Sequence, residues 1–374
     1  MHTRLIYMLL GLIALFTANL QSATKPNLLG LPEVPIPADN PQTEDKIKLG
    51  DRLYHDTRFS ADGKVSCATC HSREKGFTDN LSVSKGFKNQ MGTRSAPTVI
   101  NSAFYTSQFW DGREPDLEGQ SKQPPINPIE GGLANHKPIL KVIRGDKKYT
   151  RAFGKVFGIS ANKIDMDHVS KAIASFERTI VSGNSPFDQY NYAGKKTAMT
   201  TSQVRGLDLF RVKARCVSCH IIEQTQAIFT DNRFHNIGVG FKKIQNSEAQ
   251  TAAEMLASKR RGEDVDVTVL TQANLSEIGR FAVTENPTHV GAFKTPTLRN
   301  IAVTFPYMHD GSLETLEDVV DFYNNGGREN ENDPLSGFLS GGIKPLKLTA
   351  EEKEDLVSFL KALTSPEYQH LTSQ

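Results

Sequence analysis

The sequence predicts a mostly α-helical protein made of two similar units, and three observations lead to this fold class. The motif Cys-x-x-Cys-His occurs twice, at residues 67–71 and 216–220. A helical pattern precedes each copy, and an amphipathic helix closes each unit after a series of loops. No run of segments alternates apolar and polar residues in the way that indicates strands.

The first unit begins with a helix that Thr43 caps, with Glu44 and Asp45 in its first turn. This helix carries the segment 50–54 and leads through a loop to the first motif. The unit closes with a helix whose apolar residues recur at helical spacing, namely Val169, Ile173, Phe176 and Ile180.

The second unit repeats this order. Cap candidates lie at 200–202, the helix carries the segment 206–210, and the second motif follows. Thr349 and Glu352 form a capping box ahead of the closing helix. The apolar residues of that helix are Leu356, Phe359, Leu360 and Leu363.

Polar segments indicate how the chain is divided. The stretch 183–201 separates the two units, so we place the domains at 24–190 and 191–374. Residues 247–276 are rich in helix formers and charge and lack strong core signals. We interpret this segment as a solvated surface helix, and the alternative is a surface specific for a partner.

The first residues have the pattern of a secretory signal peptide. Arg4 supplies the positive charge, residues 5–16 the apolar stretch, and Ser22 and Ala23 the small residues of the cleavage site. This stretch is shorter than the roughly 20 residues that span a bilayer, which favours cleavage over an uncleaved anchor. We therefore expect residues 1–23 to be removed and the protein to lie in the periplasm without a stable membrane anchor.

The composition is that of a globular protein, with 38% hydrophobic and 23% charged residues. The formal net charge is only +2, and no long basic run is present. We therefore expect no nucleic-acid partner, because a protein that binds phosphates needs a basic surface.

The two Cys-x-x-Cys-His motifs predict two covalently attached c-type haems. Two thiols spaced by a helical turn can form thioethers with the vinyl groups of a haem, and the adjacent imidazole can bind the iron. A four-thiolate zinc site is the alternative, but both pairs carry the His and lie in separate units. All four cysteines belong to these motifs, so none is left for a disulfide. The predicted haem-binding residues are Cys67, Cys70, His71, Cys216, Cys219 and His220.

Further segments carry a resemblance that extends over nearly the whole mature chain. They are 109–113 (FWDGR), 124–130, 279–284, 293–300 and 306–311. With both haem motifs in order, the sequence resembles the dihaem bacterial cytochrome c peroxidases and their MauG relatives. The resemblance implies two cytochrome c-like domains, in which the N-terminal haem reacts with peroxide and the C-terminal haem relays electrons.

For the N-terminal haem, the resemblance implies that His71 is the proximal ligand and Glu130 the distal carboxylate, with Gln120 and Pro124 beside it. A carboxylate over the iron can take a proton from the inner oxygen of peroxide and return it to the leaving oxygen. The alternative for Glu130 is an ordinary residue of a surface loop.

The loop 82–93 bears on how the N-terminal haem is activated. Relatives that need reductive activation hold a distal His on this loop, and here it contains none. Phe87 lies at about that position, which predicts an iron that is already open in the oxidised protein. The alternative ligands from this loop are Met91, Lys85 and Lys88.

Trp110 is the only tryptophan of the chain. The resemblance puts it between the two haems, where an indole would shorten the electron-transfer steps and share the oxidising equivalent. The alternative is simple core packing, which is the commoner role of a buried tryptophan.

For the C-terminal haem, the resemblance makes His220 the proximal ligand. The distal ligand is a Tyr in MauG and a Met in the cytochrome c peroxidases. The helix after Thr315 carries Val319, Val320 and Tyr323 on one face, so we expect the Tyr323 hydroxyl to point inward. The family alignment favours Tyr323 as the ligand, and Met308 in the preceding turn is the alternative.

The resemblance also implies a calcium ion between the domains, bound near Thr304 and Pro306 and by an Asn side chain. Ser95 stands in place of that Asn, and a hydroxyl is a weaker calcium ligand than an amide oxygen. Ala214 replaces the surface Trp through which MauG draws electrons from its protein substrate.

These features lead to three hypotheses about function. The first is a MauG-like peroxidase that uses hydrogen peroxide to oxidise a protein partner by way of the second haem. The second is a cytochrome c peroxidase that reduces peroxide with electrons from a small cytochrome or copper protein. The third is a dihaem electron carrier without enzymatic activity. The missing loop His and the position of Tyr323 favour the first.

Overall fold

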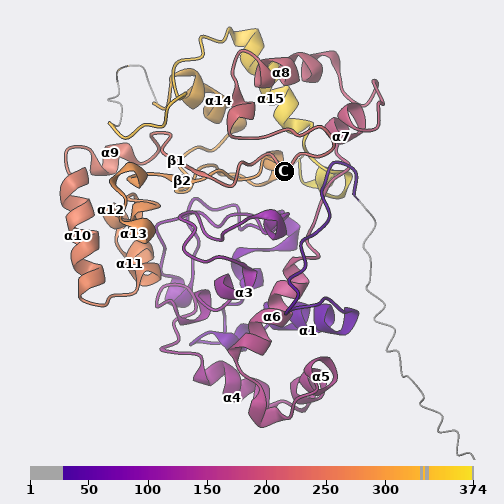
Figure 1. Cartoon of the computed structure of the whole chain (residues 1–374), viewed down its shortest axis with the longest axis vertical. Helices are drawn as coiled ribbons and strands as arrows, with labels where there is room; N and C mark the ends of the chain where they lie inside the picture. The colour runs from indigo at the N-terminus through magenta and orange to yellow at the C-terminus, as the bar shows by residue number, and fades with distance from the viewer. Residues whose placement is uncertain (1–27, 329–331, 333–336, 373–374) are drawn as a thin grey trace, which may run out of the picture.

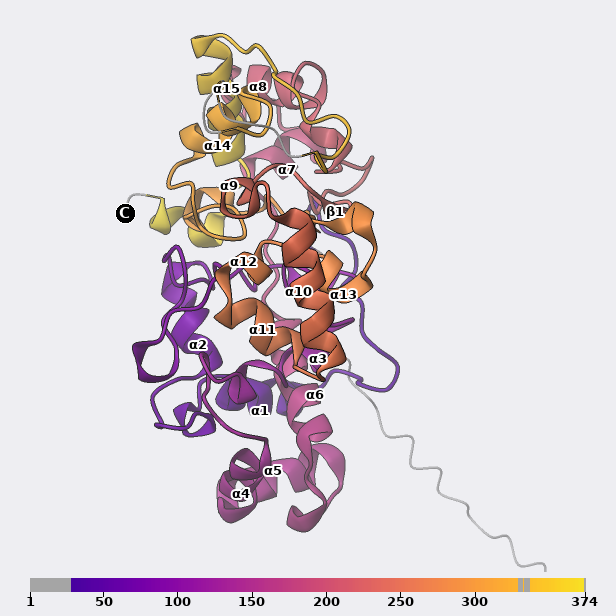
Figure 2. The same ribbon diagram turned by 90° about the vertical axis from the view of Figure 1, so that its left-hand side faces the viewer.

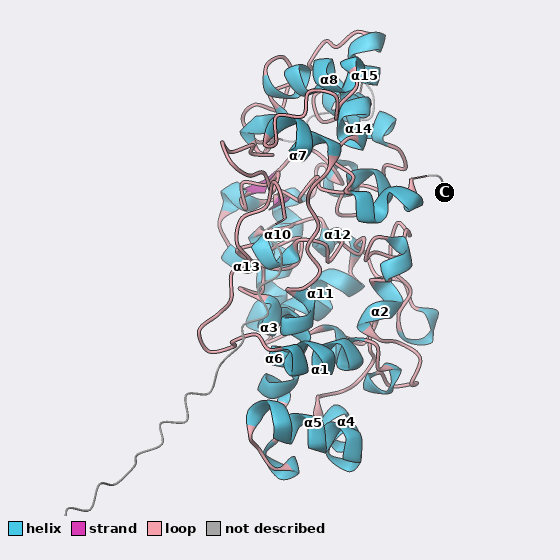
Figure 3. Cartoon of the chain, turned by 90° about the vertical axis from the view of Figure 1, so that its right-hand side faces the viewer, coloured by secondary structure: helices cyan, strands magenta, loops and turns pink. Residues whose placement is uncertain are grey.

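The described part of the chain is mostly helical, as the sequence predicts (Figure 3). The computed structural model describes residues 28–328, 332 and 337–372, so the predicted signal peptide at 1–23 lies outside it. Two helical bodies occupy the two ends of the long axis, and a third group of helices lies beside their junction (Figures 1 and 2). No helix in the described ranges has the length and apolar character that a membrane span requires.

The N-terminal body is built on the crossing of α1 (Glu44–Tyr54) and α6 (Met166–Glu177). Thr43 caps α1 as predicted, because its side chain accepts a backbone N–H of the first turn. Gly50 lies at the crossing, where a Cβ atom would be 1.9 Å from the Ala172 carbonyl oxygen, so the two backbones can approach only at a glycine. The other helices of this body are α2 (Cys67–Cys70), α3 (Leu117–Gln120), α4 (Lys137–Gly145) and α5 (Lys147–Phe157).

The C-terminal body repeats this crossing with α8 (Thr201–Arg211) and α15 (Ala350–Lys361). Gly206 takes the place of Gly50, and a Cβ atom there would be 2.0 Å from the Asp355 carbonyl oxygen. The same close contact therefore sets the helix geometry in both bodies. The body also contains α7 (Pro186–Asn191) and α14 (Leu316–Asn324).

The loops that follow the two motifs also share their backbone conformation. Phe77 and Phe229 both have a φ of 57°. Two later turns begin with Phe109 at a φ of 65° and Met308 at a φ of 74°. Positive φ is uncommon for residues with large side chains, so these matched positions indicate that one structural unit is used twice.

The predicted domain boundary lies close to α7. Phe187 of this helix packs into the core of the C-terminal body, whereas a boundary after residue 190 would put it in the first domain. The division into 24–190 and 191–374 stays a prediction.

The segment 247–276 does not form the solvated surface helix that we expected. Its helices pack around a core of their own, in which Met255 and Val269 are 0% exposed. The expectation was wrong because the first of these helices faces the core partly through small polar side chains, Thr251 and Ser258, which weaken the apolar pattern. The helices of this group are α9 (Phe241–Ile244), α10 (Glu248–Arg260), α11 (Val265–Thr271), α12 (Ala273–Ser276) and α13 (Phe281–Thr284).

Two features join the bodies at the middle of the molecule. The short strands β1 (Phe234–His235) and β2 (Phe293–Lys294) pair antiparallel there (Figure 1), and the Lys294 N–H of β2 donates to the carbonyl oxygen of Trp110, in the first half of the chain, at 2.8 Å. The last helical turn, η10 (Pro366–Leu371), follows the closing helix of the C-terminal body. Its Tyr368 and Leu371 nevertheless pack into the core of the N-terminal body. The end of the described chain therefore ties the two bodies together.

Candidate active site

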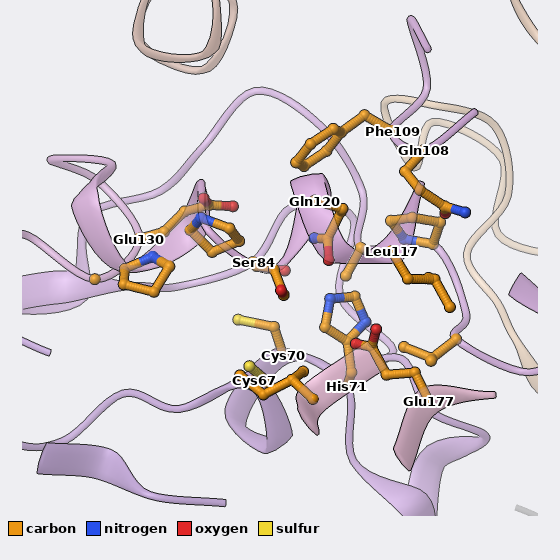
Figure 4. A pocket seen from close by; sticks show the side chains of 18 of the residues that line it. Cys67, Cys70, His71, Ser84, Gln108, Phe109, Leu117, Gln120, Glu130 and Glu177 are labelled. Carbon is orange, nitrogen blue, oxygen red and sulfur yellow. The ribbon is translucent and has the colours of Figure 1, made fainter. Parts of the chain in front are cut away.

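The first Cys-x-x-Cys-His motif forms one side of a cavity in the N-terminal body. Cys67, Cys70 and His71 line it from α2 and the residue that follows this helix. Figure 4 shows Gln120 and Glu130 across the cavity from the two sulfur atoms. The structure therefore brings together around one cavity the residues predicted for this site, which also include Pro124.

A backbone carbonyl holds the imidazole of each motif. The His71 Nδ1 is 3.3 Å from the Phe77 carbonyl oxygen, and the His220 Nδ1 is 2.9 Å from that of Phe229. Burial lowers the pKa of both imidazoles, which favours their neutral form. A neutral imidazole that donates through Nδ1 keeps a lone pair on Nε2, as a metal ligand must.

Glu130 is a half-buried residue whose Oε2 atom is buried and unbonded. Its Oε2 has no hydrogen-bond partner within the described ranges. Burial raises the pKa of Glu130 to about 8; the Asp266 carboxylate also raises this pKa, and the Arg113 guanidinium lowers it. A solvated residue of a surface loop would keep its usual pKa, so this environment favours a functional carboxyl.

The loop 82–93 lies beside Glu130, but Phe87 is not among the residues that line the cavity. The Phe87 N–H donates to the Glu130 carbonyl oxygen at 2.8 Å. Its ring packs against Gly132, where an added Cβ atom would be 2.5 Å from the Phe87 Cδ1. The three alternative ligands are exposed at the surface and also lie outside the cavity lining: Lys85, Lys88 and Met91.

The second motif lines a second cavity, in the C-terminal body. The lining includes Cys216, Cys219 and His220. α14 contributes Val320 and Tyr323, and Met308 lines the same cavity. Burial raises the pKa of Tyr323, so its hydroxyl keeps its proton unless a cation binds there. Both candidate ligands thus face this cavity, and the choice between them stays a prediction.

Trp110 lies in the wall that separates the two cavities and lines both of them. Its Nε1–H donates to the Ser95 carbonyl oxygen at 2.9 Å. Tyr105 and Lys294 also line both cavities, and the Lys294 Nζ is 3.9 Å from the centre of the Tyr105 ring. An aromatic wall between two such sites is suited to electron transfer.

Comparison with known proteins identifies the family to which the chain belongs. Residues 44–197 match the family described as di-haem cytochrome c peroxidase. The chain is 37% identical to the cytochrome-c peroxidase IdrP1 of Pseudomonas sp. (strain SCT) over 364 residues. This aligned region covers 96% of this chain and 91% of that protein. The chain belongs to the di-haem cytochrome c peroxidase family.

Other members of the di-haem peroxidase family are similar over most of their length. The chain is 36% identical to the methylamine utilization protein MauG of Methylorubrum extorquens, over 88% of this chain and 81% of that one. The crystal structure of a MauG-like protein associated with microbial copper homeostasis is 34% identical, with a TM-score of 0.73 over 91% of this chain and 95% of that one. The chain is therefore a haem peroxidase with two haem c cofactors, and it uses peroxide and a protein redox partner.

The residues around both cavities of this di-haem peroxidase fit haem c. The four cysteines carry free thiols, and each pair lies next to an imidazole whose Nε2 is available. Cys67, Cys70 and His71 would hold the first haem and Cys216, Cys219 and His220 the second, and this assignment stays a prediction. When bound at the first site, the haem would supply the redox chemistry with peroxide.

Glu177 is a second buried acid of the first cavity, and sequence analysis missed it. Its side chain points into the cavity from α6 (Figure 4). Its Oε2 also lacks a partner among the described residues, and burial raises the pKa of Glu177 to about 8. A signal was present, because this acid follows the apolar residues of α6 at helical spacing. Leu360 occupies the equivalent position in the lining of the second cavity. Phe176 comes directly before Glu177 and packs at Gly50, and Phe359 comes directly before Leu360 and packs at Gly206.

The residues predicted for calcium lie around the second cavity. Ser95, Thr304 and Pro306 all line it. The Ser95 carbonyl oxygen accepts the Trp110 N–H, and the Ser95 N–H donates to the His309 carbonyl oxygen at 2.8 Å. The calcium ion itself stays a prediction.

Proposed function

We propose that this chain is a periplasmic, MauG-like peroxidase, which takes oxidising equivalents from hydrogen peroxide at the N-terminal haem and delivers them to a protein partner by way of the second haem. The observation that carries the proposal is the position of Phe87. By the resemblance, this residue lies at about the position of the loop His of the activated relatives, and its ring packs on Gly132 outside the cavity. His71 is the only imidazole in the described lining of that cavity, so no second one competes with peroxide.

Glu130 would move the proton that peroxide cleavage requires. Its unbonded Oε2 can accept the proton of the inner peroxide oxygen and return it to the leaving oxygen. A pKa of about 8 places the carboxyl near neutral pH, where both directions of transfer are possible. Gln120, on the same side of the cavity, would orient the peroxide by hydrogen bonding.

Trp110 would pass the second oxidising equivalent between the two sites. The indole lines both cavities, and its N–H is bonded to a backbone carbonyl, which is a poor base. The indole can therefore lose an electron while it keeps its proton, so the step need not wait for proton transfer. This property supports a rapid relay.

The identity of the distal ligand at the second haem gives the sharpest test. We expect Tyr323→Phe to convert the low-spin ferric signal of the second haem to a high-spin one in electron paramagnetic resonance. The matched control is Met308→Leu, which removes the alternative ligand from the same cavity and should leave the signal unchanged. If only Met308→Leu changes the signal, the Tyr323 assignment is wrong.

The second candidate function is a cytochrome c peroxidase that draws electrons from a small cytochrome or copper protein. The identity to a protein named cytochrome-c peroxidase favours it. Stopped-flow mixing of the reduced donor with enzyme and peroxide separates the two, because rapid turnover would support this candidate and exclude the MauG-like one. Membership of a peroxidase family leaves the non-enzymatic electron carrier without support.

A further inference from the structure

Arg113 and Glu130 line the same cavity, and the guanidinium lowers the pKa of the Glu130 carboxyl. The guanidinium is buried, and each of its three nitrogens is bonded to a carboxylate. Its Nη1 donates to both oxygens of Asp111, at 2.9 and 3.0 Å, and its Nε donates to Asp266 at 2.9 Å. Its Nη2 also contacts Asp266, and its carbon lies 3.6 Å from the centre of the Phe109 ring.

Asp266 comes from the helical group around α10 and α11, far along the chain from the cavity it serves. The Asn127 Nδ2, three residues before Glu130, donates to Asp266 at 2.5 Å. The same helical group is bonded to the end of the loop 82–93, because the Thr93 hydroxyl donates to the Val269 carbonyl oxygen at 2.7 Å. These contacts hold the Asp266 carboxylate in place.

The charges in this cluster balance. Arg94 donates to Asp111 at 2.6 Å, so two buried guanidinium groups meet two buried carboxylates. The charged groups that face Glu130 are Asp266 and Arg113; the nearby sulfurs carry no charge once they form thioethers. Without the Asp266 carboxylate, the cluster would hold an excess cation beside Glu130.

We propose that Asp266 is a positioning residue, which holds the Arg113 guanidinium in its own ion pair and thereby keeps the Glu130 carboxyl free to carry the peroxide proton. An ion pair between Arg113 and Glu130 would fix Glu130 as a carboxylate and block its Oε2. The inference rests on the proposed role of Glu130. This role would make the helical group that contains Asp266 part of the chemistry in the N-terminal body.

The test is the pH dependence of fluoride binding to the oxidised, haem-loaded protein. A protonated carboxyl over the iron can donate to a bound anion and carries no repelling charge, so fluoride affinity reports the protonation of Glu130. We expect Asp266→Asn to move the midpoint of this pH profile downward by at least about one unit, since Arg113 then stabilises the carboxylate. The peroxide reaction should show the same shift of its acid limb.

Glu263→Gln is the matched control, because it removes one negative charge from the same helical group at an exposed position. Its midpoint should equal that of the wild type. Asp266→Ser is a second neutral variant, should Asp266→Asn fail to fold with haem, and it should show the same downward shift. In the double variant with Glu130→Gln the titration should disappear.

The outcomes separate this inference from the proposed function. If Glu130→Gln leaves the wild-type midpoint in place, the assignment of Glu130 fails. If Glu130→Gln abolishes the midpoint but neither neutral variant at Asp266 moves it, Glu130 keeps its role and the positioning role of Asp266 is wrong.

Discussion

The two haem cavities share one frame and differ in a few of the side chains that line them. Each has a glycine at a helix crossing and a histidine bonded to a carbonyl oxygen. The first cavity adds two acids with raised pKa values, Glu130 and Glu177, whereas the second has Tyr323 and Leu360 in its lining. The shared frame is suited to hold a haem, and we propose that these few side chains decide whether that haem handles protons or only electrons.

Glu130→Gln should produce the largest effect on this difference. Loss of the acid–base group is expected to slow the reaction of the N-terminal haem with peroxide by about 10²–10⁴-fold. The measurement is the change in haem absorbance after stopped-flow mixing with peroxide. Glu177→Gln is the control, because it alters the other buried acid of the same cavity and should slow the reaction only slightly. An equal loss in both variants would contradict a specific role for Glu130.

Glu177→Leu makes the first cavity like the second, and it should change the pH dependence of stability. The pKa of Glu177 is about 8 in the folded protein, above the usual 4.5. The folded state thus holds this proton more tightly, so stability is lost as the pH rises from about 4.5 through 8.

Urea unfolding at the two ends of this pH range measures the effect. The wild type should lose on the order of 4 kcal/mol more than Glu177→Leu between them, because each unit by which the pKa of Glu177 is raised corresponds to about 1.4 kcal/mol. The exposed acid Glu367 offers the control Glu367→Gln, which should follow the wild type. If Glu177→Leu also follows the wild type, the carboxyl is charged in the folded protein.

Trp110→Phe should produce the smallest of the three effects. A phenyl ring fills part of the wall but is harder to oxidise than an indole, so oxidation of the second haem after peroxide addition should slow by about tenfold, or about 1.4 kcal/mol. Tyr105→Phe is the control from the same wall, because it removes only a hydroxyl. If Tyr105→Phe slowed the step more than Trp110→Phe, the relay would run through the tyrosine.

Features that depend on neighbours in the chain could be predicted from the sequence. The capping box of Thr349 and Glu352 forms as expected, because its bonds span three residues. In the motif at Cys67 to His71, the short spacing is likewise enough to predict that the two thiols and the imidazole lie together. The ion pair of Arg113 with Asp266 could not be predicted, since 153 positions separate the two residues and Asp266 belongs to no recognisable pattern.

The core around α10 was missed for a different reason. Helical periodicity registers apolar side chains, and this helix uses Thr251 and Ser258 at its inner face. The orientation of Phe87 was also beyond reach, because it depends on the absence of a side chain at Gly132. Such contacts are fixed by packing between distant segments rather than by local preference.

The packing of η10 into the N-terminal core has a consequence for electron transfer between the two haem sites. The rate of electron tunnelling falls steeply with distance. A hinge between the two bodies would therefore make the rate of electron transfer between the haems fluctuate. Tyr368 and Leu371 clamp the far end of the chain onto the opposite body, across the junction that Trp110 bridges. The distance between the two haem sites should then stay constant. The rate of electron transfer between them should therefore be the same whichever body a partner binds.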